Sequence, residues 1–274
     1  MNRHPLLENL NLRLKTCKHG VMMFHANDRY IGRSFDMYGE FSELEVELFK
    51  QLVRPGMTVV DVGANIGAHT LYFAKAVGVG GQVIAFEPQR VLYQMLCGNI
   101  ALNLHNNVTA IHAGLGATLG SITVPKIDYS RGGNFGGVEL GKSENGEEVP
   151  LRRLDSCELK SCHLIKIDVE GMEQAVLEGS RSILEEHQPI LYVENDRGDK
   201  SRDLIEWLLT NGYRLYWHLP RLFNPENYFG ETENVFGDTI SVNMLCIARS
   251  KTIKAENFRE ITSPDDHWRG QRHG

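Results

Sequence analysis

The chain is organised around residues 59–70, whose sequence is VVDVGANIGAHT. This pattern predicts a buried strand, a tight turn and the first turn of a helix. Gly63 and Gly67 permit tight backbone geometry and close approach by a ligand, and the helix start offers unpaired N–H groups. A carboxylate at the end of the strand, Asp61, repels phosphate but can hold an ammonium group. The pattern therefore favours a nucleotide-like ligand that carries an amino acid over a dinucleotide.

S-adenosylmethionine (SAM) is such a ligand. The turn is typical of the first motif of Rossmann-like methyltransferases, with Asn65 where many of them have glycine. A glycine turn alone is a weak signal, but a second acid, Glu87, follows the buried strand predicted over residues 83–86. In nucleotide-binding α/β folds an acid at this place accepts hydrogen bonds from both ribose hydroxyls. Glu87 therefore predicts an adenosine site and suits SAM and NAD alike.

Strand and helix patterns alternate after residue 42, which predicts a doubly wound α/β sheet. Further strands are predicted over residues 107–112, 163–167, 189–193, 213–218 and 243–248, the last two as an antiparallel hairpin. Helices are predicted over residues 42–53, 68–77, 91–104, 172–184 and 199–211. Ser42 and Glu45 read as a capping box for the first helix. The loop after the third strand brings the amides of Gly114 and Leu115 near the adenine.

Segments outside this alternation are expected to cover the site. Residues 1–41 predict an N-terminal β-hairpin in which Tyr30, Arg33 and Tyr38 could reach a ligand. Residues 117–160 form a glycine-rich insertion on the substrate side. A long loop over residues 219–242, rich in Asn, Pro and aromatic residues, suits a lid over a polyol-like ligand. Residues 251–274 are a polar tail that we expect to be loosely ordered.

Composition limits the class of protein. The 274 residues suffice for one large α/β domain with additions, and a hydrophobic content of 42% supports a substantial core. The net charge of −6 argues against a broad nucleic-acid surface, which requires a basic face. The five cysteines form no Cys-x-x-Cys pair, so reduced thiols are expected. With no apolar signal region and no bilayer-spanning run, we expect a cytoplasmic protein.

Several ordered motifs together resemble the FkbM family of SAM-dependent methyltransferases. They are DVGANIG at 61–67, AFEP at 85–88, NFGG at 134–137, IKIDVEGME at 165–173 and YVEN at 192–195, with YWHLP at 216–220 and FNP at 223–225. The resemblance covers roughly residues 38–249. It implies a Rossmann-like class I fold whose mostly parallel, seven-stranded sheet ends in an antiparallel strand. The methyltransferase domain would then cover residues 42–250.

The resemblance further implies methylation of a hydroxyl oxygen. Known substrates of the family include polyketides and sugars, so a small-molecule or glycan hydroxyl is the expected acceptor. The resemblance selects neither one acceptor nor an oligomeric state.

Methyl transfer from a sulfonium is an in-line displacement in which the acceptor oxygen must be aligned and must lose its proton. Asp168 and Glu194 lie at the tips of adjacent predicted strands, where the methyl group is expected, and His218 lies at the end of a nearby strand. Our hypothesis is that Asp168 orients or deprotonates the hydroxyl and that His218 is the other candidate base. Lys166 is expected to pair with Asp168 or Glu194.

A divalent metal offers a second mechanism. Asp168, Glu194 and Asn195 supply oxygen ligands on neighbouring strand tips, and Mg²⁺ held there would lower the pKa of the hydroxyl. The other interpretation of Glu194 is a residue that binds sugar hydroxyls.

Three other functions remain open. A NAD-dependent oxidoreductase would share the fold and Glu87, but it would normally carry glycine in place of Asn65. A non-catalytic SAM- or glycan-binding module would bind SAM without turnover. An RNA 2′-O-methyltransferase with a Lys-Asp-Lys-Glu arrangement fits Lys166, Asp168 and Glu194, but the second lysine at a strand end is missing and the chain is acidic.

Overall fold

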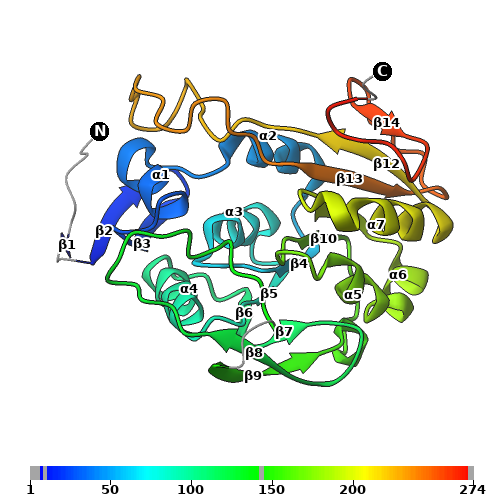
Figure 1. The fold of residues 1–274 in the computed structure, drawn as a ribbon, viewed down its shortest axis with the longest axis horizontal. Helices are drawn as coiled ribbons and strands as arrows, with labels where there is room; N and C mark the ends of the chain where they lie inside the picture. The colour runs from blue at the N-terminus through cyan, green and yellow to red at the C-terminus, as the bar shows by residue number, and fades with distance from the viewer. Residues whose placement is uncertain (1–6, 9–10, 142–144, 271–274) are drawn as a thin grey trace.

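A large mixed sheet organises the molecule in the computed structural model, which describes residues 7–8, 11–141 and 145–270 (Figure 1). Its eight strands lie in the order β14-β12-β13-β11-β10-β4-β5-β6. Their bounds are β4 (Thr58–Val62), β5 (Gln82–Phe86), β6 (Val108–Ile111), β10 (Leu164–Ile167), β11 (Ile190–Glu194), β12 (Tyr213–His218), β13 (Asn243–Ala248) and β14 (Arg259–Ile261). The sheet confirms the predicted doubly wound α/β fold.

The parallel part of the sheet contains the point at which the chain changes direction. From β4 the chain adds β5 and then β6 on one side, all in parallel pairs. It then returns to the other side of β4, where β10 and β11 are also parallel. In open α/β sheets ligands bind outside the carboxyl ends of the strands at such a switch point. This places the expected site at the ends of β4, β5 and β10.

The far edge of the sheet differs from the expectation of seven strands. As predicted, β12 and β13 pair antiparallel, and β13 is also antiparallel to β11. Residues Arg259–Ile261, within the tail that we expected to be loosely ordered, form an eighth strand antiparallel to β12. Ile261 explains the difference, because it is buried in the main core. Trp268, farther along the same tail, also packs against this core, so a few apolar residues dock a segment whose polar composition does not predict a strand.

Helices cover both faces of the sheet. Helices α5 (Glu173–Glu178), α6 (Arg181–His187) and α7 (Gly198–Thr210) pack on the face that carries Val60 and Val62 of β4. Helices α2 (Glu43–Leu52) and α3 (Ala68–Val77) pack on the opposite face, which carries Val59. Because side chains alternate along a strand, Asp61 shares the face of Val59. Asp61 is therefore buried beside α3.

One predicted helix is broken in two. The apolar pattern over residues 172–184 predicted a single helix, whereas α5 ends at Glu178 and α6 begins at Arg181. Gly179 lies between them, and a Cβ at this position would stand 2.0 Å from the carbonyl oxygen of Gly116. The close contact between the two backbones interrupts the helix, and a one-dimensional pattern cannot show it.

The N-terminal segment is a hairpin followed by a helix. Strands β2 (Leu12–Cys17) and β3 (Gly20–His25) pair antiparallel as predicted, and β1 (Leu7–Glu8) extends them. Helix α1 (Ile31–Tyr38) was not expected. Asn99 of α4 (Arg90–Leu102) and Asn103, the residue after that helix, bond the backbone of β3, so the hairpin is fixed to the main domain.

The glycine-rich insertion begins as a second small sheet. Strands β7 (Gly114–Leu115), β9 (Gly146–Arg152) and β8 (Gly120–Pro125) lie side by side in that order, and a 3-10 turn over Leu154–Ser156 follows. The segment that leaves β8 runs back to the N-terminal hairpin, where the amide of Arg29 donates to the carbonyl of Gly133 (Figure 1). The insertion and the N-terminal segment thus form one wall.

Residues 219–242, the expected lid, cross above α1 and α2 between β12 and β13 (Figure 1). The hydroxyl of Tyr38 donates to the carbonyl of Glu233 and accepts from the amide of Val235. Glu40 accepts from the side-chain amide of Asn224. These bonds tie the segment to the N-terminal part, so Tyr38 serves the lid rather than a ligand.

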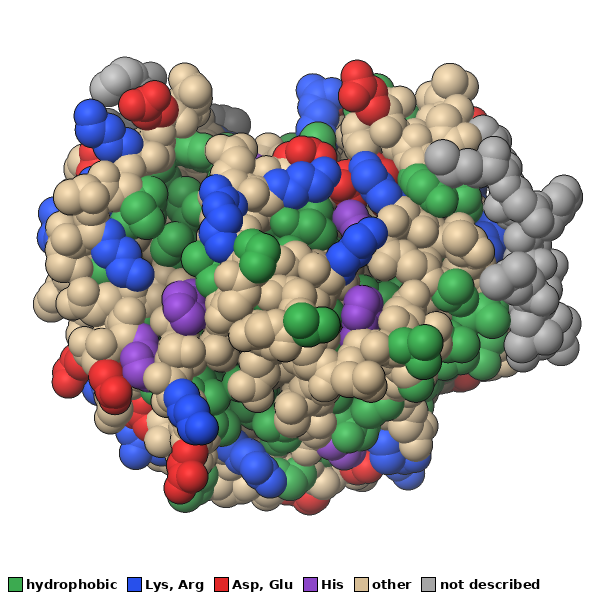
Figure 2. All heavy atoms as spheres, turned by 180° about the vertical axis from the view of Figure 1, so that it is seen from behind, with side chains coloured by type: hydrophobic (Ala, Val, Ile, Leu, Met, Phe, Trp, Pro, Cys, Tyr) green, Lys and Arg blue, Asp and Glu red, His purple; other side chains and the backbone are tan. Residues whose placement is uncertain are grey.

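The surface carries mixed charge. On the face in Figure 2, lysine and arginine side chains are interspersed with acidic ones. Among the residues that the structure describes, no helix combines the length and the apolar character needed to cross a bilayer.

Candidate active site

A cavity of about 440 Å³ lies at the carboxyl ends of β4, β5 and β10. This volume is within the usual range for small-molecule sites. Most of the residues expected to bind a cofactor line it: Asp61, Gly63, Asn65, Glu87, Gly114 and Leu115. Asp168, Glu194 and Lys166 line it as well. Residues from five separate parts of the sequence therefore meet where the switch point predicts a ligand.

The turn after β4 has the geometry that the sequence indicated. Gly63 has φ +78°, and a Cβ there would stand 1.8 Å from the carbonyl oxygen of Asp168. Asn65 also has a positive φ, of 52°, a conformation that Asn tolerates better than most residues. Gly67 has φ +92° and caps helix α3, but it is not among the residues that line the cavity. Gly67 therefore shapes the turn rather than facing a ligand.

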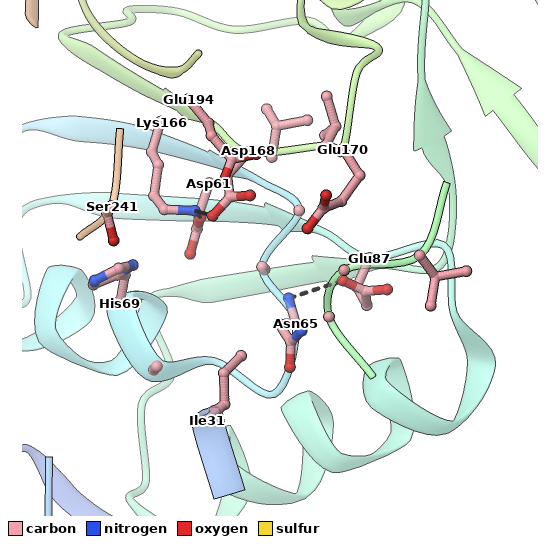
Figure 3. Close-up of a pocket in the computed structure, with 18 of the residues that line it drawn as sticks. Ile31, Asp61, Asn65, His69, Glu87, Lys166, Asp168, Glu170, Glu194 and Ser241 are labelled. Carbon is pink, nitrogen blue, oxygen red and sulfur yellow. Dashed lines mark hydrogen bonds and ion pairs between the residues drawn. The ribbon is translucent and has the colours of Figure 1, made fainter. Parts of the chain in front are cut away.

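Glu87 closes one end of the cavity. Its carboxylate accepts hydrogen bonds of 2.8 Å from the backbone amides of Asn65 and Gln89 (Figure 3). Burial raises its pKa to about 7, although the two amides favour the ionised form. The two amides hold the carboxylate rigidly at the tip of β5. In that position it can accept hydrogen bonds from the hydroxyls of a ribose.

Lys166 lies between two carboxylates at the centre of the cavity (Figure 3). Its ammonium group is 3.2 Å from Asp168 and 3.7 Å from Asp61. The expected pairing with Asp168 is confirmed, and the second partner is Asp61 rather than Glu194. Burial opposes the charged form of Lys166, but the carboxylates around it raise its pKa. The lysine is therefore a fixed positive charge.

The two oxygens of Asp61 have different partners. Its Oδ2 accepts a 2.6 Å hydrogen bond from the hydroxyl of Thr70. Its Oδ1 is buried 3.7 Å from the ammonium of Lys166, an ion-pair distance, and receives no hydrogen bond from the described residues. Oδ1 can therefore still accept a hydrogen bond from the ammonium group of a ligand.

Three acids gather at the tips of β10 and β11. Asp168, Glu170 and Glu194 each offer a carboxylate oxygen, and these oxygens lie within 4.8 Å of one another. Burial raises the pKa of Glu170 to about 7, and it raises that of Glu194 well above its usual value, with the neighbouring carboxylates adding to the effect. Arg197 pairs with Glu170. The set of three oxygens suits a divalent cation that prefers carboxylates.

Asn195 is not part of this group. Its side chain is 4% exposed and its amide donates to the sulfur of Met244. The expected group of metal ligands, Asp168, Glu194 and Asn195, is therefore wrong in including Asn195. Side chains alternate along the chain at the end of β11, so Glu194 and its successor point to opposite sides.

His218 lies outside the residues that line the cavity. Its Nδ1 shares a 2.7 Å hydrogen bond with the hydroxyl of Tyr192, and its ring packs edge-on against Phe258. Burial lowers its pKa to about 4, so the ring is neutral at physiological pH. The structure thus separates His218 from the position expected for the methyl group, because the Tyr192 ring occupies the intervening space.

The other end of the cavity is formed by residues that the sequence interpretation missed. These residues are Glu45 of α2, His69 of α3, and Ser241 and Asn243 at the end of the lid. The capping box predicted for Ser42 and Glu45 is absent, since Ser42 makes no side-chain cap bond. Glu45 points inward instead. Its place on the same helical face as the buried Phe49 was the available signal.

The wall beside the turn comes from the N-terminal part and the insertion. Tyr30, Ile31, Asn134 and Gly136 line the cavity, whereas Arg33 is exposed elsewhere. The side-chain amide of Gln89 donates a hydrogen bond to the backbone carbonyl oxygen of Phe135. The insertion is thus fixed beside the adenosine end as well as over the substrate side.

With this geometry in place, comparison with known proteins is informative. Residues 61–215, more than half of the chain, match the model of the methyltransferase FkbM domain. The chain belongs to the FkbM methyltransferase family. Membership makes it a SAM-dependent methyltransferase and confirms the family predicted from the sequence motifs.

Two curated relatives carry the same kind of name. The chain is 30% identical over 189 residues to methyltransferase sdnD of Sordaria araneosa, covering 56% of this chain and 71% of that protein. It is 27% identical over 143 residues to methyltransferase 1 of Beauveria bassiana, covering 44% of this chain and 57% of that protein. The second match therefore spans little more than half the length of that relative.

Solved structures of methyltransferases are similar at lower identity. An FkbM methyltransferase from Methylobacillus flagellatus is 19% identical with a TM-score of 0.47, over 74% of this chain and 50% of that one. Fibrillarin from Aeropyrum pernix, solved with SAM bound, is 12% identical with a TM-score of 0.46, over 90% of this chain and 86% of that one.

Proposed function

We propose that this FkbM-family chain transfers the methyl group of SAM to a hydroxyl oxygen of a sugar, glycolipid or polyketide-like acceptor. The observation that carries the proposal is a single cavity with two different ends. Glu87 and Asp61 lie where a nucleoside and an amino-acid ammonium would be held, and Ser241 and His69 lie at the far end, across Lys166 (Figure 3). A donor and a small acceptor can therefore share the cavity.

The far end suits a polyol. Thr239, Ser241 and Asn243 all line the cavity and offer hydrogen-bonding groups to an acceptor. Tyr30 is 37% exposed at its edge and stacks against Phe236 of the lid. An exposed aromatic ring beside several neutral hydrogen-bonding groups is the combination that binds an amphipathic ring with hydroxyls.

In this mechanism the chain's residues hold the reactants in line. SAM, when bound, supplies an electrophilic methyl carbon, and its sulfur leaves with the electron pair of the broken bond. Asp168, held at 3.2 Å by Lys166, is placed to accept the hydrogen bond of the acceptor hydroxyl and so to orient its oxygen. Such positioning is a major source of rate enhancement in bimolecular transfers.

A metal-assisted variant is favoured by one specific observation, the group of Asp168, Glu170 and Glu194. Its carboxylate oxygens are the ligands that Mg²⁺ prefers, and a bound ion would lower the pKa of the hydroxyl. Against this variant, Arg197 already neutralises Glu170. We therefore propose the metal-free mechanism as the principal one.

Two further expectations stay proposals. The acidic chain and its mixed surface favour a small molecule over RNA as acceptor, and a cytoplasmic location stays a prediction from the sequence.

The test begins with calorimetric titration of the purified chain with SAM, with NAD as a parallel control. Binding of SAM at micromolar concentration and none of NAD is expected. Acceptors are then screened with SAM labelled in the methyl group, using methyl hexosides, a lipid-linked sugar, a hydroxylated macrolactone and an RNA oligonucleotide. Label in the RNA alone, or binding of SAM with no transfer to any hydroxyl compound, contradicts the proposal.

A further inference from the structure

A buried carboxylate at the acceptor end has no role in the mechanism above. Glu45 of α2 lines the cavity and is 5% exposed. Its Oε1 accepts from the side-chain amide of Asn243 at 3.4 Å. Its Oε2 lies 3.9 Å from Nε2 of His69, too far for a hydrogen bond. Glu45 therefore lies on the cavity wall with Asn243 as the hydrogen-bond partner of one oxygen.

Tyr192 of β11 is an electrostatic neighbour of Glu45. Burial raises the pKa of Tyr192, and the charge of Glu45 adds to the effect. The hydroxyl of Tyr192 shares a 2.7 Å hydrogen bond with Nδ1 of His218, whose ring is neutral because burial lowers its pKa to about 4. No positive charge on this side therefore competes for the Glu45 carboxylate.

We infer that Glu45 is the catalytic base of this active site. The inference rests on the proposed hydroxyl methylation. As the oxygen–carbon bond forms and the carbon–sulfur bond breaks, with its electron pair going to sulfur, the hydroxyl proton passes to the Glu45 carboxylate. Product release then returns this proton to solvent.

The electrostatics of the cavity fit this role better than they fit Asp168 as base. Asp168 is 40% exposed and ion-paired with Lys166 at 3.2 Å, so its charge already has a partner. Burial raises the pKa of Glu45 to about 7, with Lys166 opposing and Asp168 adding to the effect. His69, which faces Glu45 from α3, is neutral because burial lowers its pKa. A base that titrates near neutrality can both take and release the proton.

Glu45 fits the acceptor better than it fits the cofactor's amino-acid end. The carboxylate of SAM would be repelled by Glu45 and Asp168. The ammonium of SAM has a partner in the unbonded oxygen of Asp61. Ser241, Asn243 and the lid surround Glu45 instead, on the side where the acceptor is expected.

The experiment compares Glu45→Gln with Glu47→Gln, whose side chain lies two residues away and is 53% exposed. SAM affinity is measured by calorimetry in two buffers of different ionisation enthalpy, which reports proton release. At pH 7 about half of Glu45 carries a proton, and a sulfonium close by should displace it. We expect Glu45→Gln to bind SAM within about threefold of the unchanged chain but to release about half a proton less.

The second part of the experiment measures turnover, using whichever hydroxyl compound of the acceptor screen is methylated. Glu45→Gln should lower kcat about 100-fold or more and abolish the acidic limb of the pH profile. Glu45→Asp should recover part of the rate.

Three results overturn the inference. One is unchanged proton release in Glu45→Gln, and another is turnover in that variant within threefold of normal. The third is SAM binding weakened more than tenfold, which would make Glu45 a ligand of the cofactor's ammonium. Failure of the unchanged chain to bind SAM at all would instead refute the proposed function, so the two failures are distinguishable.

Discussion

The backbone amide of Asn65 donates a 2.8 Å hydrogen bond to the carboxylate of Glu87. This bond joins the turn after β4 to the tip of β5, and it orients the acid that should hold the ribose. Because Gln89 donates a second bond of the same length, the carboxylate is fixed before any ligand arrives. Preorganisation of this kind lowers the entropic cost of binding.

Removing either acid of the cofactor end should weaken SAM binding. Glu87→Ala removes the acceptor of the ribose hydroxyls, and Asp61→Ala removes the partner of the ammonium. We expect each to raise the Kd for SAM about 10- to 100-fold, as for a lost hydrogen bond to a charged group. Calorimetry measures this, with Glu47→Ala on the surface as the control. Unchanged affinity for SAM in both variants would show that the cofactor does not bind at this end of the cavity.

The close approach of Gly63 to Asp168 predicts a steric penalty. Gly63→Ala would place a Cβ 1.8 Å from a carbonyl oxygen, whereas Gly56, which has a similar φ of +85°, has no atom within 4 Å of the same position. We expect Gly56→Ala to cost about 1 kcal/mol from conformation alone and Gly63→Ala about 3 kcal/mol or more. Urea unfolding of the two variants separates the two effects. Equal losses would show that the contact relaxes freely.

The contribution of Glu87 to stability should fall between pH 6 and pH 8 in the absence of ligand. Burial raises the pKa of Glu87 to about 7 from an ordinary value of 4.5. A raised pKa means that this group's contribution is fully present below about pH 4.5 and is lost as the pH rises through 7. The loss from Glu87 between pH 6 and pH 8 should be about 1 kcal/mol. Urea unfolding at the two pH values should show a smaller decrease in Glu87→Gln, and an identical decrease would contradict the assignment.

Asp168 and His218 should differ in their effect on turnover. Asp168→Asn removes the charge beside Lys166 and should lower kcat about 100-fold while SAM still binds. His218 lies outside the residues that line the cavity, so we expect His218→Ala to lower kcat less than tenfold. Near-normal turnover of Asp168→Asn with SAM bound would eliminate Asp168 as an orienting or accepting group.

Metal removal distinguishes the two mechanisms. The metal-free mechanism predicts unchanged methyl transfer in excess EDTA. Activity that disappears with EDTA and returns with Mg²⁺ would instead support an ion held by Asp168, Glu170 and Glu194. Glu170→Gln removes one of the three carboxylates that could hold the ion, and it serves as the control variant in the same assay.

The sequence predicted the donor half of the site better than the acceptor half, for a physical reason. Asp61, Gly63 and Glu87 follow buried strands directly, so strand and turn chemistry places them. Glu45 reaches the cavity through the packing of α2 against β11, and only the rotation of that helix decides whether it points inward. The position of His218 was also not predictable, because it depends on the contact between Tyr192 of β11 and His218 of β12, which are distant in sequence.

The segment that matches the FkbM domain ends before the lid and begins after α2. Tyr30, Glu45 and Ser241, which line the acceptor end, all lie outside it. Much of the proposed acceptor end therefore comes from the flanks of the matched segment, although His69 lies within it. Chimaeras that exchange residues 219–242 between relatives should change acceptor preference while the methyl-donor site stays intact, so the flanks are the natural target for changing the acceptor of this enzyme.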